Sequence, residues 1–184
     1  MRVLKRGRTL QLLSQGKVIR SYKVARGGVP IGPKARQGDH KTPEGVYVLD
    51  SRNTHSQFYK SIHISYPSVR EREAARQRGV SAGGEVFVHG LPNGYGWVGS
   101  SHWLKDWTDG CIAVTNTEMD EIWQAVADGT PIEIRPWQSQ VGCLSQGPIP
   151  RAFAGSQLGA RPYGILPTAT SFVRKWVCMP SSLP

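Results

Sequence analysis

The sequence predicts a mostly β domain of the α+β type, a curved mixed sheet or sandwich that carries two short helices. Runs that alternate apolar and polar residues recur through the first 137 positions, and a period of two is typical of strands with one buried face. Only two segments carry the capping boxes that mark the start of a helix. A length of 184 residues, with 39% apolar and 20% charged residues, suits one domain with a hydrophobic core.

The first expected element is a β-hairpin. Residues 8–12 and 18–24 alternate in polarity, and residues 14–17 form a turn between them. Residues 26–44 contain four glycines and three prolines and are therefore predicted to be a loop over the sheet. Further strands are expected at residues 45–49, 61–65, 85–89 and 131–134.

Both expected helices begin at a capping box. Ser68 and Glu71 start a short polar helix over residues 68–78, closed by Gly79. The second helix begins at Thr115, and its apolar residues recur at the spacing of one helical face before Gly129 ends it. These residues are Met119, Ile122, Trp123 and Val126.

The composition changes after Trp137. Residues 138–184 repeat Gly, Pro and Ser, contain no acidic residue and show no sustained period. We therefore divide the chain into a domain at residues 1–137 and a basic extension at residues 138–184, which is expected to be loosely ordered.

The net charge of +10 favours an anionic partner such as cell-wall polymer, nucleic acid or lipid headgroups. The basic residues are scattered, without a basic helix, zinc-finger spacing or RNA-binding motif, so nucleic acid is not expected. No apolar run reaches the roughly 18 residues of a membrane span, and no transmembrane helix is expected. The first 16 residues also lack the apolar core of a signal peptide.

One histidine and one cysteine form a candidate catalytic pair. His89 ends a predicted strand and precedes Gly90, while Cys111 follows Thr108-Asp109-Gly110. A thiol with a pKa of about 8.5 is mostly protonated at neutral pH, so a nucleophilic cysteine needs an adjacent base. His89 could accept the Cys111 proton on one ring nitrogen while the other donates to a backbone carbonyl, such as that of Gly90.

The residue before the cysteine favours the same chemistry. Gly110 has no Cβ, so the backbone can turn tightly, and the N–H groups of Gly110 and Cys111 are predicted to stabilise an oxyanion. The alternative interpretation is an inert buried thiol packed beside Ile112 and Val114.

Metal and disulfide interpretations are weaker. A zinc site would need His89, Cys111 and Cys143, but the cysteines are widely spaced and no C-x-x-C motif is present. Three cysteines would leave one unpaired in a disulfide framework. The sequence therefore predicts no metal and no cofactor.

Other residues near the pair are candidates for a substrate cleft. His63 lies on the polar face of a strand, where a structural hydrogen bond or a cleft-lining role is expected. Trp97, Trp103 and Trp107 form either a hydrophobic platform for substrate or a satellite core under a long loop. The full set of cleft candidates is Thr108, Asp109, His63, His102, Trp103 and Trp107.

The HG…(S/T)xGC pattern at His89-Gly90 and Thr108–Cys111, with two upstream blocks at residues 32–47 and 62–67, resembles the YkuD-type L,D-transpeptidase catalytic domain over about residues 2–137. The resemblance implies a thioester on Cys111, peptidoglycan stem peptides as substrate, and wall crosslinking or remodelling that maintains cell shape. It also implies the cell envelope or periplasm, for which the export signal would lie outside this chain. The oligomeric state is left open.

One departure from the family pattern leaves alternatives open. Family members commonly carry Arg two residues after the cysteine, where this chain has Ala113, so the group that holds the substrate carboxylate is undefined. Residues 38–45 resemble a branch that includes enzymes cutting the link between the wall and an anchored lipoprotein. A cysteine L,D-endopeptidase or hydrolase and a non-catalytic peptidoglycan-binding protein are therefore alternatives. Transpeptidation is favoured because the three tryptophans could exclude water from the thioester.

Overall fold

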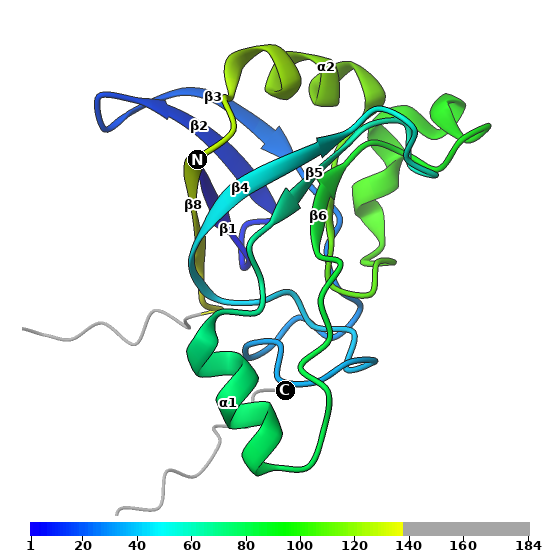
Figure 1. Cartoon of the computed structure of the whole chain (residues 1–184). Coiled ribbons are helices and arrows are strands. Elements are labelled where there is room, and N and C mark those ends of the chain that lie inside the picture. Colours follow the sequence, from blue (N-terminus) through cyan, green and yellow to red (C-terminus); the bar gives the residue numbers. More distant parts are fainter. Residues whose placement is uncertain (138–184) are drawn as a thin grey trace, which may run out of the picture. The chain divides into compact units, whose positions relative to one another are not determined.

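A curved eight-stranded sheet forms the body of the domain in the computed structural model, which describes residues 1–137 (Figure 1). The mostly β fold predicted from the sequence is thereby confirmed. The predicted extension at 138–184 lies outside the described residues. The strands are β1 (Arg2–Leu4), β2 (Thr9–Ser14), β3 (Lys17–Lys23), β4 (Gly45–Asn53), β5 (Ser61–Ile64), β6 (Phe87–His89), β7 (Ile112–Ala113) and β8 (Thr130–Arg135).

The sheet is mixed, in the order β3-β2-β1-β8-β4-β5-β6-β7. β1 pairs with β8 and β6 pairs with β7 in parallel, whereas the other neighbours are antiparallel. The predicted hairpin is β2 and β3, with Gln15 and Gly16 at positive φ in the turn. A parallel pair needs a crossover connection, so the long segment between β6 and β7 follows from their direction.

Apolar and polar residues alternate along the strands, and the apolar residues of one face form a common core. Leu10, Leu49, Ile62 and Ile132 are fully or almost fully buried. The helix α2 (Asn116–Ala125) packs over the sheet through Met119 and Ile122, both fully buried, whereas α1 (Val69–Gln77) lies at the other end of the domain (Figure 1).

Both predicted capping boxes are present. The Ser68 hydroxyl accepts from the Glu71 N–H in α1, and the Thr115 hydroxyl accepts from the Glu118 N–H in α2. The structure adds a third short helix, the 3-10 helix η1 (Gly96–Leu104), which is kinked at Gly99. Its sequence has no apolar period, and a tight helix of this kind leaves no such signal. Within residues 1–137 no helix is long and apolar enough to cross a membrane.

The α2 packing gives a stability prediction. Replacing Ile122 by Ala should lower the free energy of unfolding by about 2–5 kcal/mol, because a fully buried side chain leaves a cavity between helix and sheet. Urea unfolding of the purified variant measures the loss. The matched control is Gln124→Ala on the exposed face of the same helix, which should change it by under about 0.5 kcal/mol. Equal losses in the two variants would contradict this packing.

Candidate active site

Adjacent parallel strands carry the candidate pair. The register pairs Val88 with Ile112 and His89 with Ala113, and Cys111 directly precedes β7. Successive side chains of a strand alternate between the two faces of a sheet. Continued back to Cys111, this alternation puts the thiol on the same face as the imidazole of His89.

The His89 ring is buried and neutral. Its side chain lies against Phe58, with ring centroids 4.5 Å apart, and against Trp107 at 5.9 Å. Burial lowers the pKa of His89 to about 4. His89 Nδ1 lies 2.6 Å from the carbonyl oxygen of Gly90, the contact expected from the sequence. A neutral ring donates to that carbonyl through Nδ1–H, which leaves the lone pair on Nε2.

The Cys111 thiol, the second member of the pair, is held by contacts with the backbone of residues 85–87. It donates to the carbonyl of Glu85 at 3.6 Å, and its sulfur accepts from the backbone N–H of Phe87. Burial is the main cause that raises the pKa of Cys111. Within residues 1–137 the thiol hydrogen bond goes to Glu85 and none joins Cys111 to His89. The pair in this state is therefore a protonated thiol beside a neutral imidazole.

Thr108 organises the turn that carries the cysteine. Its hydroxyl donates to the Cys111 carbonyl at 2.7 Å and accepts from the Gly110 N–H at 3.3 Å. The oxyanion role expected for the Gly110 N–H stays a prediction, and in this conformation that N–H donates to the neighbouring Thr108 hydroxyl. The Cys111 N–H remains the candidate donor.

The other histidines occupy different positions around the pair. His63 Nδ1 contacts Asp50 at 2.7 Å, and its ring packs edge-on against Phe87, which gives it the structural hydrogen bond expected. His102 is 5% exposed, and neither of its ring nitrogens has a partner within residues 1–137. His40 is exposed, and its Nδ1 lies 2.5 Å from Asp109 Oδ1.

The three tryptophans do not gather into one platform. Trp107 lies against His89, but Trp103 lies under the ammonium of Lys23, at 5.4 Å, and Trp97 is 82% exposed. Phe58, which packs against both His89 and Trp107, was not identified from the sequence. It lies in an irregular segment between β4 and β5, where no period marks a side chain as buried.

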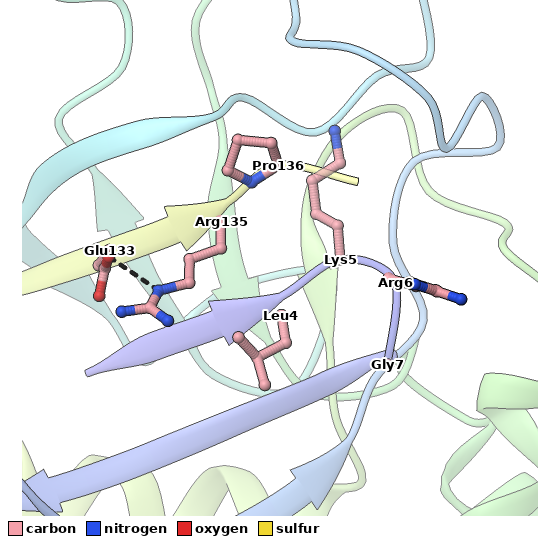
Figure 2. Close-up of a pocket in the computed structure, with 7 residues that line it drawn as sticks. All are labelled: Leu4, Lys5, Arg6, Gly7, Glu133, Arg135 and Pro136. Carbon is pink, nitrogen blue, oxygen red and sulfur yellow. Dashed lines mark hydrogen bonds and ion pairs between the residues drawn. The ribbon is translucent and has the colours of Figure 1, made fainter. Parts of the chain in front are cut away.

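A separate hollow of about 820 Å³ lies at the ends of β1 and β8 (Figure 2). Its lining comes from Leu4, Lys5, Arg6, Gly7, Glu133, Arg135 and Pro136. Neither His89 nor Cys111 contributes to it. Within the described part of the chain, no cluster of three His, Cys, Asp or Glu could hold a metal ion. The zinc alternative also involved Cys143, which lies outside that part.

His89 ends β6 and Cys111 directly precedes β7, so the candidate pair lies at two neighbouring strands at one edge of the sheet. Residues 2–134 match the family model of the L,D-transpeptidase catalytic domain. The chain belongs to this family, called YkuD, as the sequence motifs indicated.

Proteins from three organisms are among those similar to the chain. YafK of Escherichia coli (strain K12), a protein named after the same enzyme class, is 32% identical over 132 residues, which are 68% of this chain and 46% of YafK. The chain therefore spans about half the length of this curated relative. The fold is similar to the crystal structure of the helical cell shape determining protein Pgp2 from Campylobacter jejuni, with a TM-score of 0.58 and 22% identity over 75% of this chain and 47% of Pgp2. Bd1075 from Bdellovibrio bacteriovorus matches with a TM-score of 0.51 and 24% identity, over 72% of this chain and 46% of Bd1075.

Gly110 gives a prediction for the turn. It has φ +130°, and a Cβ built on it would lie 2.5 Å from the carbonyl oxygen of Lys41. Gly110→Ala should therefore lower the free energy of unfolding by at least about 1–3 kcal/mol, measured by urea unfolding. The control is Gly84→Ala, whose Cβ would meet nothing within 4 Å. Similar stability of the two variants would contradict the close approach at Gly110.

His89 gives a pH prediction. The unfolded state binds a proton on this residue near pH 6.5, whereas the folded state binds it only near pH 4. The unfolded state thus holds more protons between these values, and the free energy of unfolding should fall as the pH drops from 6.5 to 4, by up to about 1.4 kcal/mol per pH unit.

Urea unfolding at pH 7 and pH 5 measures this loss. The buried His102, whose pKa is also lowered, adds to it in every variant. His89→Gln should reduce the loss between the two pH values, while the exposed control His55→Gln should retain it. An undiminished loss in His89→Gln would show that His89 is not the group responsible.

Proposed function

We propose that this protein is a cysteine L,D-transpeptidase that acts on peptidoglycan stem peptides in the cell envelope. Cys111 is the nucleophile and His89 the general base in this proposal. The observation that supports it most is the β6–β7 register, which directs both side chains to one face, together with the Nδ1 contact to Gly90 that leaves Nε2 free to accept a proton. Family membership over residues 2–134 supports the same chemistry.

In the first half-reaction one proton is transferred, a carbon–sulfur bond forms and a carbon–nitrogen bond breaks. The thiol turns from the Glu85 carbonyl and transfers its proton to His89 Nε2, and the sulfur attacks the carbonyl carbon of the stem peptide. The tetrahedral intermediate then collapses. The carbon–nitrogen bond breaks, His89 returns the proton to the departing amine of the terminal residue, and a thioester remains on Cys111.

The surroundings of His89 suit this shuttle. A buried imidazole with a pKa near 4 holds a proton poorly, so it passes the proton on to the more basic amine as that amine departs. Phe58 and Trp107 enclose the ring and keep it in the orientation set by Gly90. Burial of Cys111 itself raises the pKa of the thiol and keeps it protonated until substrate displaces it from Glu85.

In the second half-reaction an amine attacks the thioester to give a crosslink, or water attacks it to give hydrolysis. A specific observation keeps hydrolysis as the second candidate: Trp97 is 82% exposed and Trp103 lies against Lys23, so neither encloses His89 as Trp107 does. The hydrolase form would be a cysteine L,D-endopeptidase cutting wall peptides or the link to a wall-anchored lipoprotein. A contribution to cell shape belongs to either form of the proposal.

Incubation with tetrapeptide muropeptides and an excess of amine acceptor, followed by mass spectrometry, tests the proposal. The unmutated chain should release the terminal residue and form crosslinked dimer. Cys111→Ala and His89→Ala should abolish both products, whereas His55→Ala, altered on an exposed loop, should retain them.

The product pattern separates the candidates. Tripeptide without dimer at every acceptor concentration would establish the hydrolase and overturn the transferase. Binding of muropeptide without any turnover by the unmutated chain would show a non-catalytic peptidoglycan-binding protein.

A further inference from the structure

A buried lysine lies behind the turn that carries the candidate nucleophile. The side chain of Lys34 is 4% exposed, and its ammonium contacts Asp39 Oδ1 at 3.0 Å and the carbonyl oxygen of Asp109 at 3.4 Å. A Cβ built on Gly110 would lie 3.6 Å from Lys34 Nζ. A positive charge is therefore fixed next to the residue that precedes Cys111.

Asp39 keeps this charge in place. Its carboxylate accepts hydrogen bonds from the backbone N–H groups of Ala35, Arg36 and Lys41 as well as from Lys34. Burial alone would raise the pKa of Asp39, but these hydrogen bonds outweigh it and lower the pKa to about 2. The carboxylate is thus ionised at neutral pH and divides its acceptor capacity among four donors, so it neutralises Lys34 only in part.

The lysine also restricts the orientation of a peptide plane. In a trans peptide the C=O and N–H groups point in opposite directions. Because Lys34 holds the Asp109 carbonyl on one side, the Gly110 N–H points to the other side, where it meets the Thr108 hydroxyl. The position of Cys111 at the end of this turn follows from that arrangement.

The charges around the thiol are otherwise unfavourable to a thiolate. Burial raises the pKa of Cys111, the carboxylates of Asp109 and Glu85 raise it further, and Lys34 opposes them. His89 is neutral near pH 7, as described above. His40 contacts the exposed carboxylate of Asp109, and the backbone of Lys41 approaches Gly110.

We propose that Lys34 is a positioning residue of the active site, whose ammonium holds the Asp109–Gly110 peptide and supplies positive charge that favours the thiolate of Cys111. This inference rests on the proposed function, in which that thiolate is the nucleophile. Loop 32–44, which carries Lys34, thereby contributes to the reactivity of a residue on another part of the chain.

Lys5 provides a matched control because it is a second buried lysine bound to the same loop. Its ammonium contacts the carbonyl oxygens of Gly32 and Thr42 at 2.8 and 3.0 Å and the carboxylate of Glu44 at 2.7 Å. All three partners belong to loop 32–44 and none to the turn at residues 108–111. Removing Lys5 therefore disturbs the loop without removing a cation from the nucleophile.

The experiment measures the rate of alkylation of Cys111 by iodoacetamide between pH 6 and pH 10. Mass spectrometry of the Cys111 peptide in the full chain separates its signal from those of the other two cysteines. In Lys34→Met and Lys34→Gln the midpoint of the pH profile should move upward, and the rate at pH 7 should fall about tenfold, which corresponds to one pKa unit. Lys34→Arg should retain the rate to within about threefold, because the positive charge is kept.

Lys5→Met should lower the melting temperature but leave the midpoint of alkylation unchanged. An equal shift in Lys5→Met and Lys34→Met would show that loop order alone matters and would overturn the proposal. An unchanged midpoint in Lys34→Gln would overturn it as well. If Lys34→Met does not fold, the comparison of Lys34→Gln with Lys34→Arg remains decisive, since both keep a hydrogen-bond donor and only one keeps the charge.

This readout needs no peptidoglycan. A chain without turnover whose alkylation still depends on Lys34 would refute the proposed function and leave the role of Lys34 standing. If the enzyme is active but the pH midpoint of Cys111 alkylation is unchanged in the Lys34 variants, only the role proposed for the lysine is refuted.

Discussion

The candidate site depends on the parallel pairing of β6 with β7. β7 is only two residues long, and a strand of that length cannot keep its register by itself. It is held from both sides, since Ala113 pairs with His89 on one side and exchanges two backbone hydrogen bonds with Ala25 on the other. Ile112 is fully buried in the core beneath it. These contacts fix the position of Cys111 relative to His89 along the direction of the strands.

Burial favours the uncharged form of both members of the pair. It lowers the pKa of the imidazole and raises that of the thiol, so the thiolate–imidazolium form is disfavoured. A resting thiol of this kind reacts slowly with small electrophiles and oxidants. In the proposed reaction, the energy that generates the thiolate would come from substrate binding, which would displace the thiol from the Glu85 carbonyl.

Local features of the domain could be predicted from the sequence, and non-local ones could not. The capping boxes at Ser68 and Thr115, the β2–β3 hairpin and the contact of His89 with Gly90 all join residues close in sequence. The packing of Phe58 on His89 and the contact of Lys34 with Asp109 join distant segments, and no periodicity records such contacts. The hydrogen bond from the Gly110 N–H to the Thr108 hydroxyl was also not predicted, because side-chain rotamers leave no periodic signal in the sequence.

The crossover between β6 and β7 includes exposed residues that differ in one respect from the two strands it joins: the strands position His89 and Cys111, and the exposed residues shape the nearby surface. The positions of His89 and Cys111 are set by the ladder and the core, whereas residues 93–101, which include the first part of η1, are exposed or half-buried. Exposed connections of this kind tolerate insertions, deletions and substitutions better than strands do. Natural variation can therefore change this part of the surface while His89 and Cys111 stay in place, so one scaffold could diversify in what it binds without moving the candidate pair.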